Sequence, residues 1–465
     1  MRPTIPQQIG LFSRIPRHER GETYAEINAL VAAHPEWVRW VQADLTRRRG
    51  VKAREGRRGM SAAKVLRVVL LEHIEDVSLR RLAAKLHADL DLREFLGLTL
   101  GDKTPSRSTL QRNTRMVQED TWGRLFRSLL ESEELRELES GEKARIDATV
   151  VPTNIHHPTD SSLLWDGVRV LSRTMKRAHE LFAVEYEDLS KAAKKHHTKI
   201  FWAKRKAQRE PAYAKLIEAA HAVSQQVDEV VAALRSVRSY STDSVFTEAL
   251  RDGLIAELLH FQPLLQRVID QAERRVLRGE KVPVAEKVFS IFEPHTDLIT
   301  KGTKNEFGHK VTFTMSEHFV LDAVIERGNP ADVTLATRQL ERQEELFGQA
   351  PRSAAFDGGY ASRENLEAAK ALGVERCAFS KSKGLTMEEQ AGSRRTHGRL
   401  KNFRAGIEGK ISWLKRDFGL GRCTWKGWGR FQSYVWSACF AANLQTLVRL
   451  RLASKRGRTK LRAAA

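Results

Sequence analysis

The chain has 465 residues, enough for two or three domains around a large core. It carries 79 Lys and Arg residues against 58 Asp and Glu residues, a formal net charge of +21. This excess indicates a polyanionic partner, nucleic acid rather than a membrane, although a ribosome-associated or merely basic protein would share it. The most apolar stretch, YVWSACFAANLQTLVRL, contains polar residues and is shorter than the roughly 20 residues of a membrane span.

Cysteine usage and the N-terminal sequence bear on the compartment. Cys377, Cys423 and Cys439 form no CxxC pair, so neither a disulfide framework nor structural zinc is expected. The N-terminal stretch MRPTIPQQIGLF lacks the apolar segment of a signal peptide. We therefore expect a reduced, cytoplasmic protein that associates with the nucleoid.

The first 140 residues have helical periodicity. TYAEINALVAAHPEWVRWVQADL predicts one short helix, and apolar residues spaced for an amphipathic helix return from Ser61 onward. TPSRSTLQRNTRMVQEDTWGRLFRSLLES predicts a further helix, in which Ser108 and Gln111 have the spacing of a capping box. We predict a helical N-terminal region, 1–140, as a candidate for contact with DNA.

Three arginines near the start of that helix support the DNA-binding prediction. Arg107, Arg112 and Arg115 suit contacts with phosphates and base edges. The loop before the helix is too long for a minimal helix-turn-helix, however. A plain helical bundle with a solvated basic face remains the alternative.

The first predicted strand contains an unusual carboxylate. ARIDATVVPTNIHHPTD, residues 144–160, reads as a buried strand that Pro152 ends, with Asp147 inside it. A buried carboxylate is costly unless a cation compensates it. Asp147 is therefore a candidate functional residue.

After this strand the chain is predicted to be helical over 161–284, as an insertion in the catalytic core. Apolar residues from Tyr213 to Val237 alternate at steps of three and four, and YSTDS separates them from a second such series, Leu250 to Val268. The two series predict an antiparallel helical hairpin, with a possible kink at Pro263. The first series, which we call the apolar seam, packs either within the chain or against a second subunit.

A basic stretch within the insertion also suits nucleic acid. KAAKKHHTKIFWAKRKAQR (191–209) combines basic residues with two aromatic residues. Lys204 and Arg205 are our candidates for contact with a DNA backbone. An ordinary solvated charged face is the alternative.

From about residue 287 the periodicity changes to that of strands alternating with helices. Strands are predicted at 309–315, 319–326, 353–357 and 376–380, and the last helix at 402–417. With the first strand, the series predicts an α/β fold, a mixed sheet with helices on its faces. The predicted catalytic core comprises 141–160 and 285–450, followed by a basic tail, 451–465.

Two further carboxylates accompany Asp147. Asp357 ends a predicted strand, and Glu408 lies on the last helix, on one face with Arg404 and Lys415. Three carboxylates would form an oxygen-only site, which favours Mg²⁺ or Mn²⁺ over zinc, and paired ions can activate phosphodiester chemistry. For Arg404 and Glu408 the alternative is an ordinary surface ion pair.

Other residues compete for these roles. Asp160 and Asp166 lie in polar turn sequence, with Asp160 resembling a helix cap, and Asp322 is expected to face solvent. The histidines that we considered as ligands, and expect to be structural, are His156, His157 and His309. The tryptophans that we expect to pack in the core rather than stack on bases are Trp425, Trp428 and Trp436.

These features together resemble a known family. IDATVVPTNIHHPTDSSLLWDGVRVL, FDGGYAS and the spacing of Arg404, Glu408 and Lys415 resemble DDE transposases of bacterial insertion sequences, of the ISNCY-type group. The resemblance covers nearly the whole chain, and its most specific part is the first-strand stretch. The family's tyrosine three residues before the arginine is replaced here by Lys401, which removes the basis for a DNA contact by that tyrosine.

The resemblance implies a fold, a site and an activity. It implies an RNase H-like core in which Asp147, Asp357 and Glu408 bind the metal, two Mg²⁺ or Mn²⁺ ions, with Arg404 and Lys415 contacting DNA. The implied activity is cleavage at the element's ends and strand transfer into target DNA. The implied partners are double-stranded DNA, as terminal inverted repeats and target, and further copies in a homodimer or larger assembly. A transposase-derived regulator without cleavage activity and a structure-specific nuclease remain the alternatives.

Overall fold

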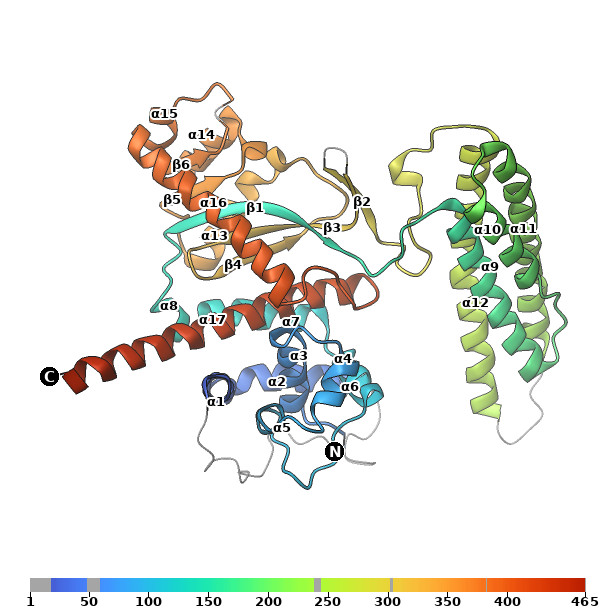
Figure 1. Cartoon of the computed structure of the whole chain (residues 1–465), viewed down its shortest axis with the longest axis horizontal. Helices are drawn as coiled ribbons and strands as arrows, with labels where there is room; N and C mark the ends of the chain where they lie inside the picture. Colours follow the sequence, from blue (N-terminus) through green and yellow to red (C-terminus); the bar gives the residue numbers. More distant parts are fainter. Residues whose placement is uncertain (1–17, 48–58, 238–243, 302–303, 382, 465) are drawn as a thin grey trace. The chain divides into compact units, whose positions relative to one another are not determined.

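The computed structural model describes residues 18–47, 59–237, 244–301, 304–381 and 383–464 (Figure 1). The chain forms two compact units, Met1–Thr153 with Gly308–Ala465, and Asn154–Phe307. We call them the first and the second unit, and each is described by itself. The N-terminal stretch MRPTIPQQIGLF and most of the YSTDS break lie outside the described residues.

The first unit begins with short helices. They are α1 (Glu19–Ala33), α2 (Pro35–Arg47), α3 (Ala62–Ile74), α4 (Leu79–Lys85), α5 (Leu90–Phe95), α6 (Arg107–Thr114), α7 (Glu119–Glu131) and α8 (Glu133–Arg136). The prediction of one helix over TYAEINALVAAHPEWVRWVQADL is wrong. Proline disfavours helical backbone at the preceding residue and suits the first position of a helix, so α1 ends before His34 and α2 begins at Pro35.

The helix predicted around Ser108 is also corrected. Ser106 caps α6, with its hydroxyl accepting from the Thr109 N–H at 3.3 Å, and Ser108 lies inside the helix. The chain then leaves helical geometry after Arg115, and α7 starts separately at Glu119. The predicted helix is therefore two helices.

Within the described residues, the chain has one mixed six-stranded sheet. The strands are β1 (Lys143–Pro152), β2 (Asp297–Lys301), β3 (Lys304–Met315), β4 (Val320–Ile325), β5 (Ser353–Phe356) and β6 (Arg376–Phe379). The order is β2-β3-β1-β5-β6, with β4 also paired to β3. β3 is antiparallel to β1 and β4, whereas β1, β5 and β6 are parallel. The predicted mixed sheet is confirmed; β2 was not predicted.

The two faces of the parallel strands carry different side chains. Ile146 and Phe356 pack in one cluster with α13 (Ala336–Phe347) and α14 (Arg363–Ala371). On the other face, the small residues Ala355 and Ala378 pack with α15 (Met387–Ala391) and α16 (Arg394–Asp417). These short side chains let α16 approach the sheet closely, where Figure 1 shows it crossing the strands.

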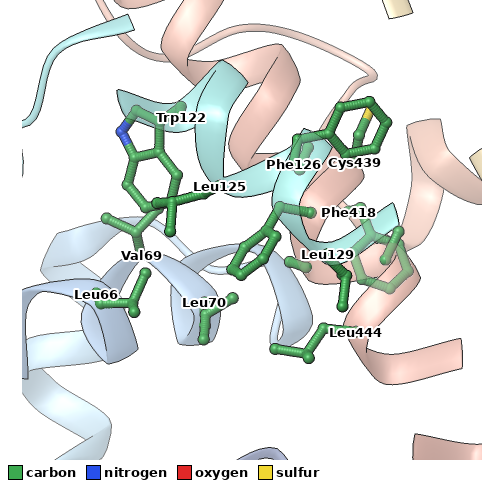
Figure 2. Close-up of a cluster of buried hydrophobic side chains, with 14 of the residues drawn as sticks. Leu66, Val69, Leu70, Trp122, Leu125, Phe126, Leu129, Phe418, Cys439 and Leu444 are labelled. Atoms are coloured by element: carbon green, nitrogen blue, oxygen red, sulfur yellow. The ribbon is translucent and has the colours of Figure 1, made fainter. Parts of the chain in front are cut away.

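The N-terminal helices and the last helix share one hydrophobic core. Figure 2 shows Leu66, Val69 and Leu70 of α3 facing Trp122 and other residues of α7, with Cys439 and Leu444 from α17 (Trp428–Ala464). Each fully buried large side chain contributes about 1.5–3 kcal/mol to folding. The predicted tail, 451–465, continues α17 as helix to Ala464. Across the part of the chain that the structure describes, no helix has the length and apolar character of a membrane span.

The second unit is a helical bundle. Its helices are α9 (Asp160–Phe182), α10 (Ser190–Trp202), α11 (Lys206–Ser236) and α12 (Ser244–Ala272), followed by the short turns η2 (Glu273–Leu277) and η3 (Val284–Glu286). Val223 and Val230 of the apolar seam are buried in the bundle's own core. The seam therefore packs within the chain, and not against a second subunit. α12 runs as one helix past Pro263.

Two glycines of the bundle give a matched test of this packing. A Cβ at Gly167 of α9 would lie 2.6 Å from Leu265 Cδ1 of α12, whereas no described atom lies within 4 Å of one at Gly253. We expect Gly167→Ala to lower the free energy of unfolding by about 1–3 kcal/mol, because the helices must separate. Gly253→Ala should raise it by about 0.5–1 kcal/mol through helix propensity. Urea denaturation followed by circular dichroism measures both; equal midpoints would contradict the α9–α12 contact.

Candidate active site

Strand register brings Asp147 and Asp357 side by side. Ile146 pairs with Phe356 in the parallel ladder of β1 and β5, and each aspartate is the next residue along its chain. Successive side chains point to opposite faces of a sheet. Since Ile146 and Phe356 face α13 and α14, the two carboxylates project toward α16.

Helix α16 places a guanidinium against both aspartates. Nη2 of Arg404 lies 3.0 Å from Asp147 Oδ2 and 2.9 Å from Asp357 Oδ1. Its Nη1 lies 3.0 Å from Glu408 Oε1, one helical turn further along. One arginine therefore contacts all three carboxylates that the sequence singled out. Arg404 and Glu408 do form an ion pair within one helix, and it belongs to a larger network, because the guanidinium is 15% exposed and also contacts Asp147 and Asp357.

Exposure increases steadily across the three carboxylates. The side chain of Asp147 is 17% exposed, that of Asp357 38% and that of Glu408 68%. Burial raises the pKa of Asp147, and the charge of Arg404 and the N–H of Ala148 only partly oppose it. The site is therefore closed at the strand and open to solvent at the helix.

Asp357 has a different electrostatic environment. Burial raises its pKa. The Gly358 N–H, the Ser380 hydroxyl at 2.9 Å and the Arg404 guanidinium all lower it, and together they outweigh burial. Its pKa consequently lies below the ordinary value. Ser380 follows β6 directly, so the neighbouring parallel strand orients this carboxylate.

Arg145 fixes α16 over the sheet. It lies two residues before Asp147, on the same face of β1, and its Nη1 donates to the Phe403 carbonyl at 2.9 Å. Lys143 and Arg145 both lie over the Phe403 ring, 4.1 and 4.8 Å from its centroid. Phe403 is thus held against β1, and Lys401, in the position of the family's tyrosine, is exposed. This packing positions Arg404, the next residue.

The remaining predicted DNA contacts lie in separate places. Arg107, Arg112 and Arg115 are exposed, but only Arg107 lies at the start of α6: Arg112 is in its last turn and Arg115 follows it. Lys204 and Arg205 are exposed between α10 and α11 in the second unit. Lys415 is half-buried near the end of α16, where its carbonyl accepts from the Gly421 N–H. Their roles remain predictions.

A basic hollow of about 280 Å³ gathers two of these arginines with residues that sequence reasoning missed. Arg107 and Arg115 line it with Arg80 of α4 and with Lys426 and Arg430. The hollow thus joins the N-terminal helices to the segment that leads into α17. Only this clustering in three dimensions reveals Arg80, Lys426 and Arg430, because nothing local distinguishes them in so basic a chain.

Two of the residues that line the hollow, Arg430 and Glu72, determine its charge away from the rim of exposed arginines. Arg430 lies 4.2 Å over the Trp425 ring and donates to the carbonyls of Thr114 and Val117. Burial raises the pKa of Glu72, the carboxyl group among the lining residues, to about 7. Near neutral pH this acid is therefore only partly ionised, and the hollow stays strongly positive.

The competing carboxylates have other partners. Thr159, not Asp160, caps α9, and Asp160 pairs with Arg275 at 2.8 Å. Asp166 is inside α9 rather than in a turn, and Arg169 lies 2.6 Å from it. The prediction that Asp322 faces solvent is wrong: it is 8% exposed. Arg342 donates to both of its oxygens, at 2.5 and 3.0 Å.

The histidines and tryptophans have packing contacts. His309 is fully buried against Trp428 and Phe431, and His157 packs edge-on against Phe307. His156 lies 3.5 Å from Asp166, while Trp425 is buried and Trp436 donates to a β4 carbonyl. Throughout the described residues, no group of three or more His, Cys, Asp or Glu side chains is arranged to hold a metal ion.

Comparisons with known proteins decide the family. A family model described as a transposase DDE domain matches residues 286–444, and one described as a transposase domain (DUF772) matches residues 13–116. This chain is a DDE transposase of insertion sequences. No curated protein and no solved structure matches it significantly. Its place in the ISNCY-type group stays a prediction.

Membership of this family bears on both the fold and the use of metal ions. The DDE domain implies an RNase H-like core, as predicted, and transposases of this kind use divalent metal ions. The DDE match contains Asp357, Arg404 and Glu408, and the other match contains Arg107, Arg112 and Arg115. Asp147 lies outside both, so its candidacy depends on the register of β1 with β5.

Two glycines of α16 test how the helix is held. A Cβ at Gly406 would lie 2.3 Å from Arg145 Nη1, whereas no described atom lies within 4 Å of one at Gly409. Gly406→Ala should lower the free energy of unfolding by about 1–3 kcal/mol, because it breaks the bond from a buried guanidinium to the Phe403 carbonyl. Gly409→Ala should raise it by about 0.5–1 kcal/mol. Chemical denaturation of the full chain measures both, and a stabilised Gly406→Ala variant would refute the role given to Arg145.

Proposed function

We propose that this transposase cleaves DNA at the ends of its insertion sequence and joins the freed 3′ ends to target DNA. Asp147, Asp357 and Glu408 are its metal ligands in this proposal. The observation that carries it is the meeting of these carboxylates, from two strands and one helix, at the guanidinium of Arg404. A folding unit gains little from three carboxylates around one cation, because a net negative charge remains.

The donor set fits a divalent metal ion. All three groups offer carboxylate oxygens, the ligands that Mg²⁺ and Mn²⁺ prefer, and soft sulfur ligands are absent from the set. We propose two ions, held by Asp147 and Asp357 with Glu408 completing the site. When bound, such ions supply an activated attacking oxygen and stabilise the charge on the leaving oxygen. Arg404 lies against all three carboxylates in this structure.

The chain's own residues supply position rather than covalent chemistry. Neither step of the proposed reaction needs an attached protein intermediate, so no serine, tyrosine or cysteine nucleophile is required. The β1 ladder holds Asp147, and the Ser380 hydroxyl orients Asp357. Glu408 is the most exposed of the three, and we place the incoming DNA backbone on its side of the site.

We propose that the basic hollow holds the phosphate backbone of the element's end. Arg107 and Arg115 line it, and the arginine fork matches phosphate geometry. Arg112 is directed by α6 to neighbouring phosphates or bases, and Lys204 and Arg205 contact DNA without reading its sequence. Lys415 follows the backbone beyond the carboxylates.

Paired ends require more than one active site. Joining two ends to one target takes two strand transfers, and one set of three carboxylates serves one at a time. We propose that two or more copies assemble on the terminal inverted repeats, in the cytoplasm at the nucleoid. Since the apolar seam is internal, the contact between copies lies elsewhere or forms through DNA.

The two other candidate functions differ in their products. A regulator that has lost cleavage would not need three carboxylates gathered at one point. A structure-specific nuclease would cut without joining, and strand-transfer products separate it from a transposase.

Replacement of the carboxylates tests the proposed site. Asp147→Asn, Asp357→Asn and Glu408→Gln should each reduce cleavage of an element end with Mg²⁺ by at least about 10³-fold, because each removes a ligand of the catalytic ion. Binding to the same end, measured without metal, should change little. A gel assay with labelled duplex measures both, and Asp322→Asn is the matched control. A variant that cleaves at nearly the wild-type rate would show that its residue is not a ligand.

Three double variants that each remove two charges test the DNA contacts. Arg107→Gln with Arg115→Gln should weaken binding to the element's end at least about tenfold more than binding to scrambled duplex. Lys204→Gln with Arg205→Gln should weaken binding to both duplexes equally. Each lost phosphate contact should reduce the slope of log affinity against log salt concentration by about one. Arg352→Gln with Arg376→Gln is the control, because both residues lie at the N-terminal ends of β5 and β6, whereas Asp357 follows the C-terminal end of β5. Equal losses on both duplexes from the first pair would contradict end recognition by the hollow.

A further inference from the structure

The guanidinium of Arg404 stands where a catalytic cation would have to be. Its Nη2 contacts one carboxylate oxygen of Asp147 and one of Asp357. Its Nη1 takes the nearest oxygen of Glu408.

We infer that Arg404 is an internal competitor of the metal ions: it holds the three carboxylates together in the metal-free transposase and is expelled when the ions bind. The inference rests on the proposed function, in that it takes these acids as ligands. A divalent ion binds carboxylate oxygens at about 2.0–2.2 Å, closer than the guanidinium nitrogens do. The same oxygens cannot keep Arg404 at 2.9–3.0 Å and also surround such an ion without placing two cations in contact.

The surroundings of Arg404 suit release. Its Nε is buried and has no hydrogen-bond partner among the described residues, so the bound position leaves one donor unsatisfied. Glu408, its third partner, is 68% exposed, which leaves an open side toward solvent. A guanidinium that leaves the acids on this side reaches the place proposed for the DNA backbone, where phosphate oxygens offer it a matching pair of acceptors.

Release of Arg404 would couple metal and DNA binding. If ions free the guanidinium for a phosphate, then metal raises the affinity for DNA, and DNA raises the affinity for metal by the same factor. A pair that serves only to hold α16 on the sheet predicts the opposite: loss of Arg404 would spread the acids and weaken metal binding. The two roles therefore differ in the sign of one measured change.

The deciding experiment is calorimetric titration of the full chain with Mn²⁺ alone, without DNA. Arg404→Gln should bind Mn²⁺ at least about tenfold more tightly than wild type, because a positive charge leaves the site. Arg404→Lys keeps a single charge but not the fork, and its affinity should lie between the two. Arg399→Gln removes the same charge from an exposed position on the same helix and should match wild type. Asp147→Asn gives the level of binding outside the site.

Two further readouts keep the test independent of activity and of folding. Without metal, the melting temperature of Arg404→Gln should fall, and saturating Mn²⁺ should raise it more than it raises that of wild type. Mn²⁺ should increase the affinity of wild type for an element end, and this increase should disappear in Arg404→Gln. Fluorescence anisotropy with a labelled, 3′-blocked end that cannot be cleaved measures the affinity.

The outcomes separate the inference from the proposed function. If wild type binds Mn²⁺ and Asp147→Asn does not, the ligands are supported; equal or weaker binding by Arg404→Gln would then overturn only the competitor role. If neither wild type nor Arg404→Gln binds more Mn²⁺ than Asp147→Asn, the proposed ligands fail and the inference fails with them. If Arg404→Gln misfolds, Arg404→Lys decides instead, because it is also expected to bind Mn²⁺ more tightly than wild type.

Discussion

The pairing of Ile146 with Phe356 is the contact on which the candidate site depends. It sets the register of two parallel strands, and this register makes Asp147 and Asp357 neighbours although about half of the chain separates them in sequence. A slip of one residue would turn one aspartate into the cluster packed under α13 and α14. The apolar side chains on that hidden face therefore determine the chemistry on the other face. Arg404 can reach both acids only because Ala355 and Ala378 let α16 lie close.

Periodicity in the sequence was sufficient to predict five of the six strands of the sheet. Alternating apolar residues predicted β1, β3, β4, β5 and β6, and the α/β order between them, because each of these strands has a buried face. The seam from Tyr213 to Val237 likewise predicted a long helix. β2 escaped notice, since the short segment DLITK has little apolar pattern. Local signals also misplaced boundaries: two serines stand near the start of α6, and only the backbone geometry selects Ser106 over Ser108.

The candidate carboxylates could be named from the sequence, but their electrostatics could not. An aspartate within an apolar strand is conspicuous, and so is one that follows a strand before two glycines. That a single arginine would contact both, with Glu408, depends on how α16 crosses the sheet, and this follows from Arg145 and Phe403. Asp322 shows the converse. Its hairpin indicated solvent exposure, yet Arg342 from α13 covers it. The basic hollow could not be predicted either, because its basic residues come from α4, from α6 and the residue after it, and from α17 and the segment before it.

The second unit leaves and re-enters the first at paired residues, because Pro152 of β1 lies opposite Gly308 of β3 in the antiparallel ladder. The helical bundle therefore connects the antiparallel strands β1 and β3 in the place where a simple hairpin has its turn. Its length can change without altering any strand register, since loop-closure entropy grows only slowly with loop length. The number of residues between the first two acids therefore records what was inserted into a hairpin and says nothing about the distance between their side chains. In this transposase that spacing is a poor guide to the site, whereas the strand register around each acid is a good one.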